Sequence, residues 1–218
     1  MMRTRQIFRI TGLVQGVGFR PTVWHTAKRL TLSGSVYNDA DGVVATVEGE
    51  EPLVLHFPDE LRRDIATRAP LARIDAILKL GTVPCLHDDD FVITESRAGR
   101  AHTMVTPDAA TCPACEREIF DPQNRRYRYA FTNCTHCGPR FTITRRIPYD
   151  RAQTSMAGFV MCPACRREYE NPADRRFHAQ PNACPVCGPQ LKLTDAAGHV
   201  IAGDPVAETV RLLGEGKI

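Results

Sequence analysis

Two groups of residues in this sequence could do chemistry: a glycine-rich loop that ends in an arginine, and a set of paired cysteines. The loop is TGLVQGVGFRP, residues 11–21, and it joins a segment with strand periodicity to one with helix periodicity. Such a loop can turn successive backbone N–H groups toward an anion. Arg20 adds a planar, bidentate donor suited to phosphate. The residues expected to bind a phosphoryl group are Gln15, Gly16, Val17, Gly18, Phe19 and Arg20.

The loop matches neither of two widespread nucleotide-binding loops. It lacks the lysine and the serine or threonine of a P-loop, and Gly18 is followed by Phe19-Arg20-Pro21 where a dinucleotide loop has its third glycine. A nucleotide is therefore not the expected ligand. From the loop alone, an ordinary glycine turn with a solvated arginine stays open as an alternative.

Eight of the nine cysteines form four C-x2-C pairs, and Cys85 stands alone. Two such turns brought together supply the four sulfur ligands of a tetrahedral zinc site. We predict two structural zinc sites, and pairing within each half of the set is the simplest arrangement, although pairing between halves stays open. His136 and His178 could replace a cysteine, but four sulfurs already complete each tetrahedron. The expected ligands are Cys112, Cys115, Cys134, Cys137, Cys162, Cys165, Cys184 and Cys187.

The cysteine region is an internal duplication. Residues 112–139 align without gaps on residues 162–189, and the cysteines, an Arg-Arg pair, a proline and the Cys-Gly-Pro ends coincide. Between Cys112 and Gln190, twelve arginines stand against seven acidic residues, a net charge of +5. This balance fits a surface for nucleic acid or for an acidic partner. The arginines of the two pairs would be the contacts, but their repeated position also fits structural ion pairs: Arg125, Arg126, Arg175 and Arg176.

Periodicity predicts the elements that position the loop. Pro21 would begin a first helix, and residues 52–67 a second one, with a kink at Pro58 or a start closer to Asp59. The resulting order is β-α-β-β-α-β, an α+β fold of ferredoxin type with both helices on one face of the sheet. Strands are expected at 5–10, at two segments of 33–50 around an Asn-Asp-Ala-Asp-Gly turn, at 72–80 and at 90–95.

Composition and texture suggest where the parts of the chain begin and end. With 43% hydrophobic and 24% charged residues, the sequence is typical of a soluble globular protein. The N-terminus, MMRTRQIFRI, has no apolar segment of a secretory signal, so the cytoplasm is the expected location.

The helical pattern that starts at Asp204 looks like the opening of a further, absent domain. The expected parts are 1–97, a linker at 98–109, the cysteine domain at 110–192 and the start of a truncated domain at 193–218.

The N-terminal part resembles an acylphosphatase domain. The residues that carry the resemblance are GLVQGVGFRP, Ser35-Val36-Tyr37-Asn38 and Asp41-Gly42, and the expected fold agrees with that family. The resemblance implies that the loop and Arg20 hold the phosphate of the substrate. It also implies that Asn38 orients the attacking water, so Arg20 and Asn38 are the expected catalytic residues.

The combination of this domain with the duplicated cysteine unit resembles the HypF family of hydrogenase-maturation carbamoyltransferases. RRFHAQPNACPVCGP, residues 175–189, is similar to the second zinc motif of that family. The resemblance implies carbamoyl phosphate as substrate, and ATP and Mg²⁺ only in domains beyond this chain. It implies that the carbamoyl group passes to the C-terminal cysteine of HypE, for the cyanide ligands of [NiFe]-hydrogenase. Residues 193–218 would then begin a YrdC-like domain. The alternative is a zinc-ribbon module that binds nucleic acid or protein, beside a non-catalytic anion-binding domain.

Overall fold

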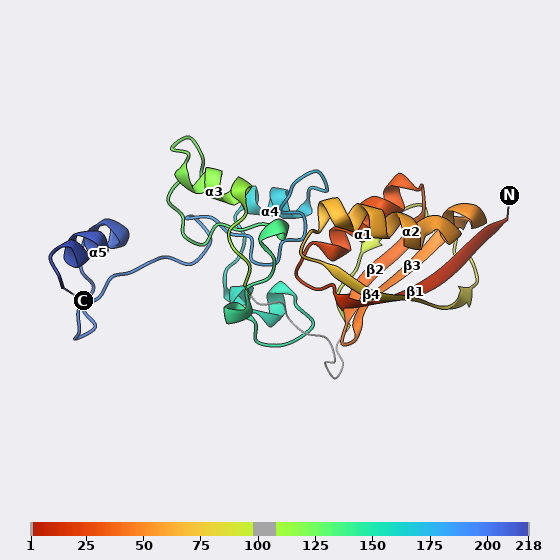
Figure 1. The fold of residues 1–218 in the computed structure, drawn as a ribbon, viewed down its shortest axis with the longest axis horizontal. Helices are drawn as coiled ribbons and strands as arrows, with labels where there is room; N and C mark the ends of the chain where they lie inside the picture. Colours follow the sequence, from red (N-terminus) through yellow and green to blue (C-terminus); the bar gives the residue numbers. More distant parts are fainter. Residues whose placement is uncertain (1, 98–107, 218) are drawn as a thin grey trace.

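The computed structural model describes residues 2–97 and 108–217, so most of the predicted linker, at 98–107, lies outside the described residues. Two folded regions follow one another along the longest axis, and a separate helix lies at the far end (Figure 1). The elements of the first region are β1 (Arg3–Leu13), α1 (Phe19–Arg29), β2 (Ser33–Asp39), β3 (Gly42–Glu50), α2 (Glu51–Arg68), β4 (Arg73–Val83) and β5 (Phe91–Ile93).

The strands of the first region form one sheet in the order β4-β1-β3-β2-β5. Neighbouring strands are antiparallel, except that β2 and β5 run parallel. Helices α1 and α2 cover the same face of the sheet (Figure 1). The core between the two layers includes Ile10, Phe57 and Phe91, each at most 1% exposed. The predicted ferredoxin-like α+β fold is therefore confirmed.

Helix α2 confirms the predicted span of 52–67 to within one residue at each end. A beginning near Asp59 is wrong, because the helix runs from Glu51 to Arg68 through Pro58. A proline inside a helix costs about 3 kcal/mol or more, since it removes one N–H donor and crowds the preceding turn. Side-chain burial against the sheet offsets this cost, at about 1.5–3 kcal/mol for each large apolar group. The buried side chains of the helix are Val54, Phe57, Leu61 and Ile65.

Helix α1 begins earlier than predicted. Its first residue is Phe19, and the preceding Gly18 is the N-cap. Pro21 is therefore the third helical residue, still within the first turn, whose N–H groups have no partner inside the helix. Because the start moves forward, Arg20 lies within the first turn of α1 and not in the loop before it.

The second region is built from the duplicated unit. Helices α3 (Pro113–Phe120) and α4 (Pro163–Glu170) begin directly after a cysteine and start with a proline. Besides the cysteines, the buried apolar side chains of this region are few, with Tyr129, Met156 and Ala183 forming one small cluster. The turns that complete the region are η1 (Thr135–Cys137), η2 (Phe141–Ile143), η3 (Arg151–Gln153) and η4 (Ser155–Gly158).

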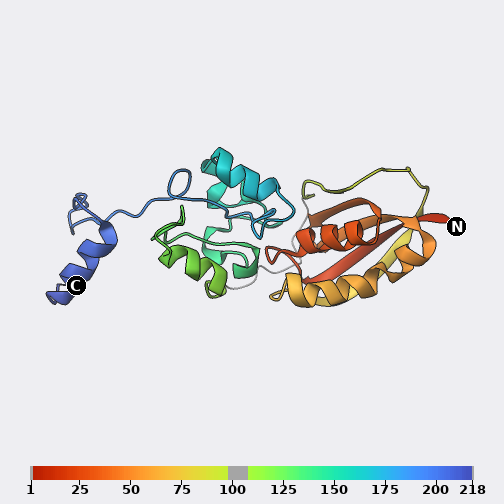
Figure 2. The ribbon, with the colours of Figure 1, turned by 90° about the horizontal axis from the view of Figure 1, so that it is seen from above.

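The C-terminal segment forms the predicted helix, α5 (Pro205–Gly214). The Asp204 side chain caps its N-terminus by accepting from the backbone N–H groups of Val206 and Ala207. The helix lies at one end of the molecule in both views (Figures 1 and 2), and an ion pair between Asp204 and Arg128, at 3.2 Å, links its N-terminus to the second region. Among the described residues, no helix is both long and apolar enough to cross a membrane.

Candidate anion site and metal centres

The glycine loop leaves β1 and enters α1 in a fixed conformation. Val14 and Val17 are buried in the core of the first region and anchor it. Gly16 and Gly18 have φ values of 73° and 77°, in the left-handed region that favours glycine. In the described part of the chain, the backbone amides of residues 15–20 donate to no protein acceptor. The loop therefore combines free donors, a turned backbone and a helix N-terminus, which together suit an anion.

Arg20 is positioned beside the loop by the first turn of α1. Its side chain is only 8% exposed. Nη2 donates to Oδ1 of Asp150 at 2.6 Å, and Nη1 donates to Oγ of Ser96 at 3.3 Å. Asp150 belongs to the segment between the two cysteine repeats. The fold thus brings a carboxylate of the second region to the arginine that was predicted to bind phosphate.

Asn38 is a buried amide without a protein partner. It lies near the end of β2 and is 1% exposed. Neither Oδ1 nor Nδ2 makes a hydrogen bond to any described residue. The segment after β5 runs past both predicted groups, because the Arg97 N–H donates to the Asn38 carbonyl and Ser96 contacts Arg20. A buried amide left unpaired costs about 1–3 kcal/mol, so it points to a bound ligand or water.

The Gln15 side chain joins the two regions. Its Nε2 donates to the carbonyl oxygens of Asp39 and Gly42, at 2.8 and 3.0 Å, in the turn between β2 and β3. Its Oε1 accepts from the backbone N–H of Tyr149 at 3.1 Å. The side chain of Gln15 is therefore fully used by the protein, and only its backbone amide is left for an anion.

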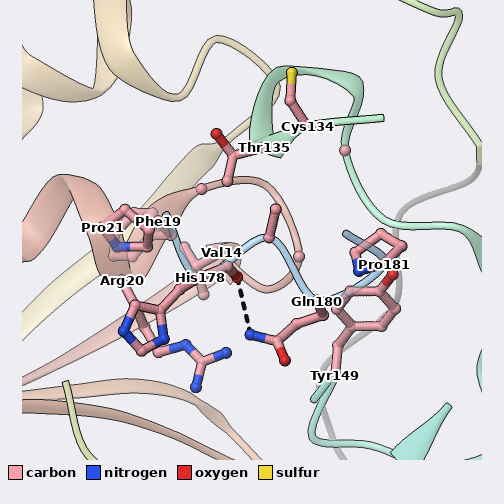
Figure 3. A pocket seen from close by; sticks show the side chains of 14 residues that line it. Val14, Phe19, Arg20, Pro21, Cys134, Thr135, Tyr149, His178, Gln180 and Pro181 are labelled. Atoms are coloured by element: carbon pink, nitrogen blue, oxygen red, sulfur yellow. Dashed lines mark hydrogen bonds between the residues drawn. The ribbon is translucent and has the colours of Figure 1, made fainter. Parts of the chain in front are cut away.

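The second region covers the loop closely. A Cβ atom at Gly16 would lie 2.6 Å from Cβ of Pro139, and one at Gly18 would lie 3.0 Å from Cβ of Thr135. The space enclosed over the loop is about 20 Å³, room for about one water molecule. Figure 3 shows the side chains around this space, among them Thr135, Tyr149, His178, Gln180 and Pro181.

A larger cleft of about 430 Å³ lies next to the enclosed space. Arg20, His178 and Gln180 line both volumes, so they form the boundary between them. An anion that enters through the cleft therefore meets the guanidinium of Arg20 before it reaches the loop amides. The other polar walls of the cleft include Glu95, Ser96, Asp150, Arg151 and Tyr169.

His178 is a neutral neighbour of Arg20. Burial, and then the positive charge of Arg20, lower the pKa of this imidazole to about 4, although Asp150 acts in the opposite direction. At pH 7 the ring adds no charge to the site. Neither His178 nor His136 belongs to a cysteine cluster, which agrees with the expectation that sulfurs alone form the metal ligands.

The eight paired cysteines form two clusters, one in each repeat. Within each cluster, the four sulfur atoms lie within 4.8 Å of one another, so the cysteines pair within repeats and not between them. Neighbouring sulfurs are 3.6 and 3.9 Å apart in the first cluster, and 3.6 to 3.8 Å apart in the second. A tetrahedron with Zn–S bonds of about 2.3 Å has edges of about 3.8 Å. Both clusters therefore fit four-coordinate zinc.

The arginine pair of each repeat makes ion pairs with a glutamate of the other repeat. Arg126 of the first repeat donates to both carboxylate oxygens of Glu168 in the second, at 2.9 and 2.5 Å. Arg176 of the second repeat makes the corresponding ion pair with Glu118 of the first. Glu118 and Glu168 occupy equivalent repeat positions. Burial alone raises the pKa of Glu168, but hydrogen bonds from Arg126 and Arg125 outweigh it and lower the pKa to about 2.

The other arginine of each pair reaches the opposite metal cluster. Nη1 of Arg175 donates to Sγ of Cys115 at 2.9 Å, and Nη2 of Arg125 donates to Sγ of Cys165 at 3.3 Å. A site of four thiolates and one Zn²⁺ carries a net negative charge, so a guanidinium beside it is stabilising. These contacts show that the arginine pairs hold the repeats together. Arg126 and Arg176 are at most 3% exposed and so cannot form a surface for nucleic acid, whereas the partly exposed Arg125 and Arg175 are engaged in ion pairs with Glu168 and Glu118.

Asp150, Tyr149, His178 and Gln180 were not predicted as part of the site. The first two lie between the repeats, where no motif marks them. For His178 and Gln180, one feature of the sequence could have indicated a role in the site. Within the aligned repeats, Arg128 and Ala130 of the first unit are replaced by His178 and Gln180 in the second. The second copy therefore departs from the first at positions that face the loop.

The sequences of the two regions match two known protein families. The acylphosphatase family profile matches residues 6–93, and the HypF finger profile matches residues 111–144 and 161–194. A Lactobacillus johnsonii acylphosphatase is 40% identical over 68 residues, which are 31% of this chain and 75% of that protein. Carbamoyltransferase HypF2 of Cupriavidus necator is 53% identical over 213 residues, 96% of this chain and 26% of that protein. The chain belongs to the HypF family.

Solved HypF structures share the fold over the whole chain. One is a full-length HypF in a phosphate- and nucleotide-bound form, with a TM-score of 0.86 and 43% sequence identity. The match covers 100% of this chain and 28% of that HypF chain. The other is HypF of T. kodakarensis, with a TM-score of 0.81 and 43% sequence identity. That match covers 99% of this chain and 27% of the T. kodakarensis chain. The chain thus spans about a quarter of the length of these HypF proteins.

Proposed function

We propose that the loop, Arg20 and Asn38 hydrolyse an acyl phosphate, and that the substrate is carbamoyl phosphate. The observation that carries the proposal is the buried amide of Asn38, unpartnered among the described residues, in the same domain as a loop of free amides and a fixed guanidinium. Membership of the HypF family, whose relatives are named carbamoyltransferases, supports carbamoyl as the acyl group.

The groups suggest a direct displacement at phosphorus. The loop amides and Arg20 bind the non-bridging phosphoryl oxygens and stabilise the charge that develops on them. Asn38 orients a water molecule, whose oxygen attacks the phosphorus. The bond from phosphorus to the bridging oxygen breaks, carbamate leaves with that oxygen, and the water proton passes to solvent. Because carbamate is a good leaving group, positioning and electrostatics replace a general base.

The activity of the longer protein is a wider proposal. There, the carbamate would enter an ATP- and Mg²⁺-dependent step, and the carbamoyl group would pass to the C-terminal cysteine of HypE. The two zinc ions would be structural, because four cysteines leave no open coordination position. We keep the proposed divisions at 1–97, 98–109, 110–192 and 193–218, the last as the start of a YrdC-like domain. A reducing cytoplasm suits cysteines that form no disulfides.

Phosphate release from carbamoyl phosphate by the 218-residue chain tests the proposed hydrolysis. We expect Arg20→Ala to reduce the rate by at least about a hundredfold, the usual effect of losing one donor to a developing oxyanion. Arg63→Ala is the matched control, because Arg63 lies on the exposed side of α2 and is 73% exposed. The hydrolysis proposal fails if the wild-type chain releases no phosphate above background, or if both variants release it equally fast.

A further inference from the structure

The guanidinium of Arg20 already has an anionic partner inside this chain. The Asp150 carboxylate lies 2.6 Å from Nη2 of Arg20, and its side chain is 22% exposed, toward the cleft. No residue of the first region makes this ion pair; it comes from the segment between the zinc-binding repeats. A domain that matches acylphosphatases therefore has its anion-binding arginine neutralised by a neighbouring region.

The residues on either side of Asp150 hold it in place. The Tyr149 N–H donates to Gln15 Oε1, in the glycine loop itself. The Arg151 N–H donates to Gln180 Oε1 at 2.8 Å, and Arg151 Nη1 donates to the Gln180 carbonyl at 2.7 Å. The segment is thus attached both to the loop and to the second repeat. Asp150 meets Arg20 because of a built contact and not because a mobile side chain happens to reach it.

The ion pair lies on the boundary between the cleft and the loop. Arg20 borders both the cleft of about 430 Å³ and the enclosed space of about 20 Å³ over the loop. The smaller space holds about one water molecule, too little for a phosphoryl group. A phosphoryl group that reaches Arg20 from the cleft therefore competes with Asp150 for the Nη2 donor.

We propose that Asp150 is an exchange residue that sets the affinity and the charge selectivity of the anion site. Asp150 binds Arg20 until a phosphoryl dianion replaces it, and it returns when phosphate leaves. The inference rests on the proposed function, since it takes an acyl phosphate as the entering anion. A carboxylate monoanion, such as the carbamate product, offers Arg20 no more charge than Asp150 does. The exchange thus favours a phosphoryl dianion and disfavours rebinding of the product.

Titration of the full chain with inorganic phosphate tests the exchange. We expect Asp150→Asn to bind phosphate about tenfold more tightly than wild type, because the competing negative charge is gone while the shape is kept. Asp59→Asn is the matched control, because it makes the same change at an exposed position of α2. The double variant Arg20→Ala/Asp150→Asn should lose the gain, which shows that the effect passes through Arg20. Two zinc ions per chain in each variant confirm that the second region is intact.

Phosphate affinity in Asp150→Asn that equals or falls below that of Asp59→Asn overturns the inference. Weaker binding would mean that Asp150 holds Arg20 in its productive orientation. The outcome for the proposed function is separate. If hydrolysis depends on Arg20 but affinity does not change in Asp150→Asn, only the exchange is wrong. If affinity rises as expected but no variant hydrolyses carbamoyl phosphate, the hydrolysis is wrong and the exchange stands. If no variant binds phosphate, both are wrong.

Discussion

At the scale of single residues, the fold accommodates the two proposed catalytic groups, Asn38 and Arg20, in different ways. The Asn38 amide is buried without a partner among the described residues, although a leucine with the same number of side-chain heavy atoms would leave no unmet hydrogen bonds there. Arg20, in contrast, is stabilised by Asp150. Asn38 therefore lowers the stability of the fold, whereas the buried charge of Arg20 is compensated by Asp150. This difference separates what each substitution should do to folding and to activity.

Asn38→Leu should abolish most hydrolysis without weakening the fold. The substitution removes two unpaired polar atoms from a buried place, so the free energy of unfolding should stay constant or rise by about 1 kcal/mol. If Asn38 orients the attacking water as proposed, its loss should reduce phosphate release by at least about a hundredfold. Urea unfolding and phosphate release measure the two effects on one preparation. A fall in stability of 2 kcal/mol or more would mean that the Asn38 amide makes stabilising hydrogen bonds.

His178 should make stability depend on pH between about 6.5 and 4. Its pKa is lowered from 6.5 to about 4 in the folded chain, so the unfolded chain binds the proton more readily. Stability is unaffected above pH 6.5 and decreases as the pH falls toward 4, by on the order of 3 kcal/mol in total. Unfolding of wild type and His178→Gln at pH 7 and pH 5 isolates this effect, because acid loss of zinc affects both alike. An unchanged difference between the two proteins would contradict the shift.

At the scale of elements, the reciprocal arginines make each repeat depend on the other. Arg175 supplies a donor to Cys115 and an ion pair to Glu118, and Arg125 does the same for the second repeat with Cys165 and Glu168. Neither repeat has a sizeable apolar core of its own. The metal of one unit is therefore held partly by the chain of the other.

Arg175→Gln should weaken the metal cluster of the first repeat, although Arg175 belongs to the second. The substitution removes the charge that lies 2.9 Å from Sγ of Cys115. We expect the first zinc to leave at least about tenfold faster under a chelator, with alkylation mapped by mass spectrometry to Cys112, Cys115, Cys134 and Cys137. Arg117→Gln, at an exposed position of α3, is the control. Faster alkylation in the second repeat alone would contradict the crossed arrangement.

The same elements show what could be read from the sequence. Strand periodicity, the hairpin turn and the cysteine spacing are local patterns, so the sheet and both clusters were predicted correctly. The span of α2 was predicted too, but the alternative start near Asp59 was wrong, because packing against the sheet outweighs Pro58. The contact of Arg20 with Asp150 joins residues far apart in the sequence, and a single aspartate carries no motif. The surroundings of the loop therefore needed the fold.

At the scale of the whole molecule, the second region packs over the end of the first region that carries the glycine loop. The contact extends beyond the loop, since the ring of Trp24 on α1 lies 5.5 Å from that of Phe177 in the second repeat, in an edge-on arrangement. Most of the second region is held by metal and ion pairs, whereas the first region has its own core. Loss of metal should therefore separate the two.

Zinc removal should uncover the single tryptophan while the first region stays folded. Without its metals the second region loses the cross-links that replace a core, so Phe177 leaves the Trp24 ring and the ring meets water. We expect a strong chelator to release two zinc ions per chain and to shift the tryptophan emission to longer wavelength. Hydrogen exchange should stay slow in β1 and β3, which belong to the independent core. The zinc-loaded chelator is the control. If both ions leave and the emission does not move, the second region stays packed on the loop without its metals, and its contacts with Gln15, Arg20 and Trp24 are enough to hold it there.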